Sequence, residues 1–402
     1  MDAAITHDAV ERVRPLHGVK PALTALAIGT FAVGAGEFGI MSILPAFAHS
    51  LNLTIEQATP VISSYALGVV IGAPVLAVAG AKLSRRSMVL ALLCLFIIGN
   101  IATILCTQLP YIEAMRFITG LPHGAFFGIA ALIGASLVDH AHRGRAIGFV
   151  FSGIMLSTLI GAPAFGVASQ YVSWRIIYGF IAFLGFICIL SVLYYIPKDK
   201  PHPDINPLSE LDALKSGQVW LTLLTGAIGF GGLFGVYTFL TSALAEVTHL
   251  NHWIISIYQV IYGLGLVAGN AFGSIMVDRN LNKTVLIALI ASIIFMIGFW
   301  LTLPYAWLAL IFCFLLPAAC IMLSPALQTR LMDVAGEAQT LAAALNHSAF
   351  NMANALGPWI AAQLIESGFG LGSVGWGGAL LSAGGLLIYL VAMYLMKRSA
   401  AH

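Results

Sequence analysis

The sequence predicts an all-α polytopic membrane protein with twelve transmembrane helices in two pseudo-symmetric six-helix bundles. Its mean hydropathy is +0.96, and only 8% of its 402 residues are charged, which lies far outside the range of soluble domains. Its apolar runs have about the 20 residues that a helix needs to span a bilayer. The later runs repeat motifs of the earlier ones, as in transporters built from two related halves.

A polar leader, residues 1–21, precedes the apolar runs. It is basic and no cleavage site closes the first run, as expected of a retained cytoplasmic leader. The first half, residues 22–196, has apolar runs at 22–47, 57–80, 88–109, 111–138, 145–168 and 175–196. The second half, residues 219–396, has them at 219–244, 253–277, 284–303, 306–331, 338–365 and 372–396. A polar cytoplasmic linker at 197–218 joins the halves, and a cytoplasmic tail at 397–402 ends the chain.

The basic residues predict the orientation, because Lys and Arg accumulate in cytoplasmic segments. With the N-terminus inside, 16 of the 18 Lys and Arg residues lie on the inner side; the exceptions are Arg116, within a run, and Arg175, at the outer start of the sixth run. Both termini are therefore predicted to be cytoplasmic. The net charge of +2 is too small to indicate nucleic-acid binding. The five cysteines lack the CxxC spacing of a metal site.

An internal repeat relates positions that lie about 196 residues apart along the chain. The matching pairs are Ala35–Ile40 with Gly231–Val236, Leu67–Gly72 with Leu264–Gly269, Pro122 with Pro317, and Pro163 with Pro358. A polar group found in only one half is not needed to build the fold of a half. It is therefore a better candidate for a functional residue than a group that both halves share. Glu37 pairs with Leu233 and His123 with Ala318, which singles out Glu37 and His123 as candidates.

Glu37 and His123 are expected at one depth in the membrane. Glu37 lies ten residues before Phe47 and His123 twelve residues after Tyr111, which puts them about 15 and 18 Å from the same side at 1.5 Å per residue. Arg116 lies about 10 Å nearer that side, where a charge needs a partner or a cavity. Burial disfavours a charged carboxylate and a cation favours it. Glu37 is therefore predicted to be the proton-responsive group, with His123 as partner or second carrier and Arg116 setting the field.

Each of these residues also has a structural interpretation. Glu37 could make a permanent hydrogen bond between helices, His123 could donate to a backbone carbonyl, and Arg116 could clamp the helices near the outer face. Gly120, Gly124 and Gly128 recur every four residues, so they share one helix face and are predicted to let a neighbouring helix pack closely.

A second group of residues is predicted to bind substrate through aromatic surfaces and a few polar handles, the pattern of a small-molecule pocket. These candidates are Phe38, Met41, Phe126, Phe127, Phe234, Tyr237, Tyr258, Gln259 and Tyr262. The alternative is that they belong to the core or face lipid. The eleventh run adds a polar stripe of Asn346, His347, Asn351 and Asn354, which is either a substrate-facing strip or an interhelical hydrogen-bond seam.

Several motifs together resemble the major facilitator superfamily over the whole chain. Gly80–Arg86 and Gly273–Lys283 resemble the two copies of its cytoplasmic gating loop, and Arg116 with Gly120 resembles its span-four arginine motif. The run from Gly161 through Pro163 to Gly166 resembles the glycine-proline motif of the drug/proton antiporter branch. Ala35–Met41, Tyr65–Pro74 and Pro122–Gly128 are similar to AraJ-type, arabinose-efflux-like exporters. The resemblance implies that spans one and four line a central cavity and that the protein is a monomer.

The gating candidates follow from the same resemblance. They are Arg85, Arg86, Asp139, Asp278, Arg279, Asp333, Gly161 and Pro163. The first loop has Ser84 where the family usually has an aspartate, whereas the second keeps Asp278. Charge pairing between the halves is therefore expected at Asp278 with Arg279, or at Asp139 and Asp333. Alternatively, these charges serve only as topology signals, and Gly161 with Pro163 forms a bend and close-packing site.

The predicted function is secondary active export of a small organic solute, sugar-like or drug-like, from a bacterial inner-membrane protein in exchange for protons. The proton gradient is the energy source, and no cofactor is expected. A proton-coupled importer or a facilitator would use the same residues and remains an alternative. A membrane-embedded enzyme would need a nucleophile or a metal set, and the sequence has neither HExxH nor GxSxG.

Overall fold

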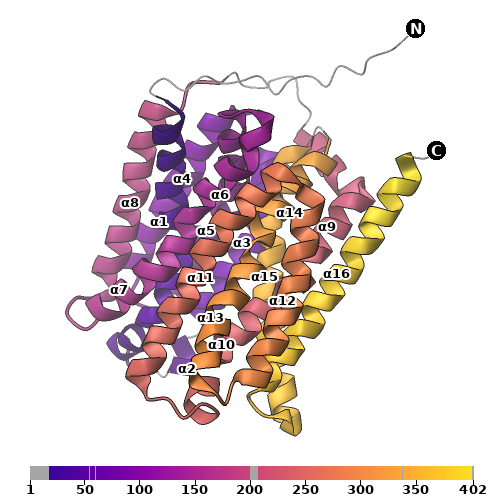
Figure 1. Ribbon diagram of the computed structural model, residues 1–402. Helices are drawn as coiled ribbons and strands as arrows, with labels where there is room; N and C mark the ends of the chain where they lie inside the picture. Colours follow the sequence, from indigo (N-terminus) through magenta and orange to yellow (C-terminus); the bar gives the residue numbers. More distant parts are fainter. Residues whose placement is uncertain (1–17, 54, 59, 200–206, 337, 401–402) are drawn as a thin grey trace.

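The computed structural model describes residues 18–53, 55–58, 60–199, 207–336 and 338–400, and these residues form helices and no strand. Most of the predicted leader therefore lies outside the described residues, as do linker residues 200–206 and tail residues 401–402. The long helices run side by side in one bundle (Figure 1). The prediction of an all-α polytopic fold is confirmed.

The helices of the first half reproduce the predicted runs, with ends that shift by a few residues. They are α1 (Val19–Ser50), α2 (Ile55–Ala58), α3 (Pro60–Gly80), α4 (Arg85–Leu105), α5 (Leu109–Ser136), η1 (His140–His142), α6 (Arg143–Leu156), η2 (Ser157–Gly161), α7 (Ala162–Ala168) and α8 (Trp174–Tyr195). The segment η2 is a π-helical turn that joins α6 to α7, so these three elements make one span.

The second half follows a 3₁₀ helix, η3 (Pro207–Lys215), in the linker. Its helices are α9 (Gly217–Gly229), α10 (Gly231–Glu246), α11 (His252–Arg279), α12 (Leu281–Thr302), α13 (Ala306–Ile321), α14 (Leu323–Val334), α15 (Gln339–Leu364), η4 (Ile365–Phe369) and α16 (Ser373–Ala400). Two predicted spans are thus each built from two consecutive helices, α9 with α10 and α13 with α14.

Several helices begin where a short polar side chain can accept a hydrogen bond from the first turn. The side chain of Ser84 accepts from the backbone N–H of Ser87 at the start of α4, and that of Asn280 accepts from Lys283 at the start of α12. Such caps satisfy N–H groups that have no partner within the helix. Ser84 and Asn280 lie 196 residues apart, so the repeat extends to the way these two helices begin.

Among the described residues, eleven helical segments are long and apolar enough to cross a membrane. The predicted eleventh run is the exception, although its helix α15 is 26 residues long. This helix packs against α3, α5, α9 and α10, and its polar residues are largely buried among them. A helix enclosed by other helices needs no apolar surface toward lipid, which explains why α15 falls below the hydropathy of the others.

The two halves repeat the same close helix contact. A β-carbon on Gly72 of α3 would overlap the backbone of Leu121 in α5, and one on Gly269 of α11 would overlap the backbone of Ala318 in α13. Leu121 and Ala318 lie 197 residues apart, as do the two glycines, so the repeat preserves the contact, and the structure makes Ala318 the counterpart of Leu121 rather than of His123. The predicted small-residue face of α5 is also confirmed: a β-carbon on Gly128 would lie 2.6 Å from the backbone nitrogen of Ala344 in α15.

One end of the bundle carries most of the basic residues, and we call it the basic end. It holds the start of α1, the loop between α3 and α4, the starts of α6 and α15 and the end of α16. In Figure 1 it is the upper end, where both chain termini are marked. The opposite end holds the loop between α7 and α8 and the start of α11.

Candidate functional site

The structure brings Glu37 and His123 together, from different helices, in the middle of the first half. Glu37 lies on α1 and His123 on α5, and the Oε2 atom of Glu37 is 3.7 Å from the Nε2 atom of His123. Both side chains are buried. The sequence placed them at one depth, and their separation is that of an ion pair rather than of a direct hydrogen bond.

Tyr65 and Arg116 extend this cluster toward the opposite end. The hydroxyl of Tyr65, on α3, is 3.0 Å from Nδ1 of His123, so His123 is held by a side chain and not by the backbone carbonyl that its structural interpretation supposed. The guanidinium of Arg116 lies over the Tyr65 ring, 4.4 Å from the ring centre, and Arg116 Nε donates to the carbonyl of Val61 at 3.4 Å. A cation over an aromatic face is stabilised electrostatically.

Arg116 is almost wholly buried, and its two terminal nitrogens make no hydrogen bond to any residue that the structure describes. A buried cation without a full set of partners is costly. Through Val61 and Tyr65, Arg116 of α5 contacts α3, as the clamp interpretation requires.

His123 also contacts the second half. Its ring stacks on Phe127 with ring centres 4.8 Å apart, and Phe127 in turn lies 4.1 Å from His347 of α15. The ring centres of His123 and His347 are 5.4 Å apart. The charged cluster of α1 and α5 is thus in contact with α15 through a group of three rings.

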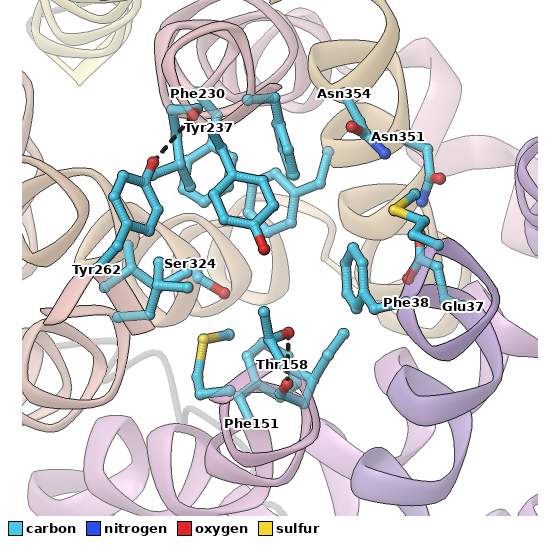
Figure 2. A pocket seen from close by; sticks show the side chains of 18 of the residues that line it. Glu37, Phe38, Phe151, Thr158, Phe230, Tyr237, Tyr262, Ser324, Asn351 and Asn354 are labelled. Carbon is cyan, nitrogen blue, oxygen red and sulfur yellow. Dashed lines mark hydrogen bonds between the residues drawn. The ribbon is translucent and has the colours of Figure 1, made fainter. Parts of the chain in front are cut away.

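A cavity of about 350 Å³ lies between the halves. Glu37 and Phe38 of α1 face it beside Asn351 and Asn354 of α15, and Tyr237 of α10 faces it from another wall (Figure 2). The other predicted substrate residues that line it are Met41, Phe234, Gln259, Tyr262 and His347. Glu37 is the one residue among those lining the cavity that is an acid or a strong base.

The cavity is closed toward the basic end and opens toward the opposite end. Phe151 and Ile154, on the basic side, are buried, whereas Met41 and Tyr237, on the opposite side, are 39% and 40% exposed. His347 and Asn351 of α15 line the cavity, and Nε2 of His347 and the side-chain oxygen of Asn351 are buried and make no hydrogen bond to a described residue.

Four predicted substrate residues do not line the cavity. Phe126 is buried in the core against Gly29, and Phe127 is buried between His123 and His347. Tyr258 points away, and its hydroxyl donates to the carbonyl of Ala306. Asn346 donates to the side chain of Gln328 on α14. The stripe on α15 therefore serves both proposed purposes, a seam at Asn346 and a cavity wall at His347, Asn351 and Asn354.

Sequence reasoning missed a set of cavity residues that are mostly apolar. They are Phe151, Ile154, Met155, Thr158, Phe230, Leu233, Thr238, Leu266, Ile321, Ser324 and Phe350. The repeat carried a signal for one of them, because Leu233 is the partner of Glu37 and lies at the corresponding wall. Nothing in the local sequence distinguishes the others from apolar residues that face lipid.

Two acids of the second half meet the start of α6 at the basic end. Asp278, at the end of α11, accepts hydrogen bonds from the backbone N–H groups of Gly144 at 2.6 Å and Arg145 at 3.3 Å. It also pairs with the Arg145 side chain at 3.2 Å. Asp333 pairs with Arg143 at 2.7 Å. Asp278 and Asp333, two of the residues expected to carry charge pairing between the halves, thus each pair with an arginine of the first half, whereas the Arg279 side chain is exposed.

The remaining gating candidates have local contacts in the first half. The backbone N–H groups of Arg85 and Arg86 donate to Asp199 of the linker, at 2.7 and 3.2 Å, and the Arg86 side chain donates to the carbonyl of Leu193. Asp139 precedes η1, where its carbonyl accepts from His142.

The glycine-proline run at Gly161 and Pro163 forms the junction between the π-helical turn η2 and α7. A proline has no N–H for the helix ladder, and π-helical turns are a recognised way to absorb that loss. The closest approach of α1 is not at this run. It occurs at Gly153, where a β-carbon would overlap the backbone of Ala27.

Comparisons with known proteins agree with this architecture. The sequence profile of the Major Facilitator Superfamily matches residues 26–358. The chain is 32% identical to the inner membrane transport protein YdhP of Escherichia coli strain K12, over 94% of this chain and 96% of YdhP. It is 29% identical to AraJ of the same strain, over 95% and 98% of the two chains. It is also 29% identical to a chloramphenicol resistance protein of Streptomyces lividans, over 91% and 94%.

Among solved structures, the chain is similar to the transporter FucP in its outward conformation. The TM-score is 0.75 at 14% sequence identity, and the match covers 92% of this chain and 98% of FucP. At this identity the likeness concerns the fold alone.

Proposed function

The chain belongs to the Major Facilitator Superfamily, and from this premise we propose that it exports a small organic solute in exchange for protons by alternating access. Membership makes it a multi-pass integral membrane protein and a transporter of small solutes rather than an enzyme. The observation that carries the proposal is the Glu37–His123 pair at the wall of a cavity between the two halves.

Glu37 fits the role of proton-coupling group because one side chain faces both the cavity and a histidine. When the cavity is open, water reaches the carboxylate, and when it closes, the same group loses that solvation and binds a proton more readily. His123, 3.7 Å away, serves as partner or second carrier. Arg116 sets the field through Tyr65. Each positive charge that moves inward through 100 mV releases about 2.3 kcal/mol.

The lining of the cavity favours a drug-like over a sugar-like solute. Aromatic and aliphatic side chains form most of its wall, and polar handles are confined to a few positions, chiefly on α15. Among the described residues, no Lys or Arg lines it, so an anionic solute would meet Glu37 without a compensating cation. We therefore expect an uncharged or cationic organic solute with an apolar body. The S. lividans relative is a chloramphenicol resistance protein, which supports both this class and export.

The proposal includes the orientation of the chain in the membrane, the limits of its two halves and its oligomeric state. The basic end is cytoplasmic by the positive-inside rule, which puts both termini inside a bacterial inner membrane, as the name of the YdhP relative suggests. The halves extend over residues 22–196 and 219–396, with 197–218 as linker, and the transporter acts as a monomer. In this orientation the present structure faces outward, since its cavity is closed at the basic end.

The test is proton release from energised inside-out vesicles, followed with a pH-sensitive dye while candidate solutes are added. The panel contains cationic and neutral drugs, sugars, nucleosides and amino acids. We expect a drug-like compound to dissipate the gradient with the wild-type protein and not with Glu37→Gln, because glutamine cannot exchange a proton. Glu366→Gln is the matched control, since Glu366 is an exposed acid at the opposite end, and it should behave as wild type.

Other outcomes have distinct meanings. Equal responses of wild type and Glu37→Gln would remove Glu37 as the coupling group. Solute-driven proton movement that occurs only in right-side-out vesicles would indicate import. Solute flux without proton movement in either orientation would indicate a facilitator.

A further inference from the structure

The repeat predicts a second gate that mirrors the contact of Asp278 with α6. In the first gate, a carboxylate at the end of α11 accepts hydrogen bonds from the backbone of Gly144 and Arg145, at the start of α6. The helix that corresponds to α11 in the first half is α3, and the one that corresponds to α6 in the second half is α15. A symmetric molecule would therefore carry a carboxylate at the end of α3 that meets the start of α15.

The first half has no carboxylate at that position. The caps Ser84 and Asn280 are 196 residues apart, and the packed glycines Gly72 and Gly269 are 197 apart. Subtracting these offsets from 278 gives positions 82 and 81, which are a lysine and an alanine. The structure also corrects the sequence comparison here, because Ser84 is the helix cap that matches Asn280 and not the counterpart of Asp278.

The start of α15 nevertheless meets a carboxylate, and it comes from the linker. The backbone N–H of Leu341 donates to Oε2 of Glu210 at 2.9 Å. Leu341 lies 196 residues after Arg145, so the acid occupies the same helical turn as Asp278 does on α6. Glu210 is 7% exposed, and it lies on η3, which packs against α3, α9 and α15.

The linker is also fixed to the first half. The side chain of Asp199, at its beginning, accepts from the backbone N–H groups of Arg85 and Arg86 at the start of α4. At its other end η3 contacts α3. The linker thus joins the first half to the start of α15 at the basic end, and Glu210 makes the hydrogen bond on the side of the second half.

We propose that Glu210 is the gating carboxylate that α3 lacks, so that docking of η3 on α15 holds the basic end closed. Opening that end separates α15 from the first half, and it requires the bond between Glu210 and Leu341 to break or η3 to leave α3. The second gate of this transporter is therefore made by the linker and not by the loop after α3. The inference concerns the conformational cycle alone and holds for export and import alike.

The test measures the relative populations of the conformations with the basic end closed and open, in nanodiscs, by double electron–electron resonance. Spin labels are attached at Tyr171→Cys and Trp253→Cys in a background without the native cysteines. Both positions are exposed at the opposite end, one in each half. The distance between the labels shortens when that end closes and the basic end opens. A hydrogen bond to a charged group of this kind corresponds to about a ten- to hundredfold change in an equilibrium.

We expect Glu210→Gln and Glu210→Ala to increase the short-distance population about tenfold or more relative to wild type. Asp212→Asn is the matched control, because Asp212 lies on the same helix but is exposed and pairs with Lys215; it should leave the distances unchanged. Adding Ala81→Asp to Glu210→Gln places an acid where the repeat predicts one and should restore the wild-type balance.

Three outcomes would overturn the proposal. The first is an unchanged distance distribution in both Glu210 variants. The second is a shift in Asp212→Asn as large as that in Glu210→Gln, which would indicate a general effect of η3. The third is a distance distribution of the Glu210→Gln, Ala81→Asp double variant that stays as short as that of Glu210→Gln. An acid at the end of α3 would then not replace Glu210.

Discussion

The starts of α6 and α15 are related by the repeat, yet they are held in different ways. Two acids of the second half, Asp278 and Asp333, meet α6, and each pairs with an arginine of the first half. A single acid meets α15, and it belongs to the linker. In both halves a carboxylate accepts a hydrogen bond at the start of the repeated helix, but it comes from α11 in one case and from the linker in the other.

The physical reason lies in the helices themselves. The first N–H groups of a helix have no partner within the helix, and the helix dipole adds a partial positive charge there. Both starts lie against the other half at the basic end, so their N–H groups need acceptors from outside their own helix. An acid on a loop or on a linker helix satisfies this need equally well if it can reach.

The largest effect should come from breaking the gate on α6. Asp278→Asn removes the charge that accepts from two backbone N–H groups and pairs with Arg145. We expect the closed basic end to lose about 3 kcal/mol, which the label pair at residues 171 and 253 would report as a nearly complete change of conformation. Arg143→Ala breaks a more exposed ion pair and should destabilise the conformation with the closed basic end by about 0.5 kcal/mol. Equal effects of the two variants would contradict the assignment of Asp278 as the main gate.

A smaller effect should follow from disturbing the packing of α15 on α5. A β-carbon on Gly128 would lie 2.6 Å from the backbone of Ala344, so Gly128→Val forces α15 away from the first half. Overpacking of this kind costs about 2 kcal/mol, and the same labels should report a shift toward the conformation with an open basic end. Gly217→Val is the control, because a β-carbon at Gly217 would have no neighbour within 4 Å. A wild-type distance distribution in Gly128→Val would show that this contact persists when the basic end opens.

Much of the fold was predictable from the sequence. The apolar runs located the spans to within a few residues, and the repeat related contacts that the structure then confirmed at Gly72 and Gly269. The shared depth of Glu37 and His123 was also predictable by counting residues along two helices, whereas their separation of 3.7 Å depends on how α1 and α5 pack. The eleventh span was found as well, although the polarity of α15 becomes understandable only once its neighbours are known.

The partners of charges and the faces of helices were harder to predict. Asp278 was expected to take part in charge pairing between the halves, but the sequence did not identify its partner, Arg145 of the first half. Phe126 and Phe127 were expected in the cavity, but Phe126 is buried in the core against Gly29 and Phe127 is buried between His123 and His347. Glu210 carried no signal at all, because its importance depends on η3 lying against both α3 and α15.

The sequence by itself determined which segments cross the membrane, how deep each residue lies and which positions the two halves share. Only the tertiary structure decided how each helix is rotated about its axis and which segment reaches the start of a neighbouring helix. The reason is that lipid, the core and an apolar cavity all accept the same side chains, so hydrophobic periodicity does not distinguish the faces of a helix enclosed by them. The depth of a residue in the membrane follows from its position along a helix. The direction in which its side chain points follows from how that helix packs against its neighbours.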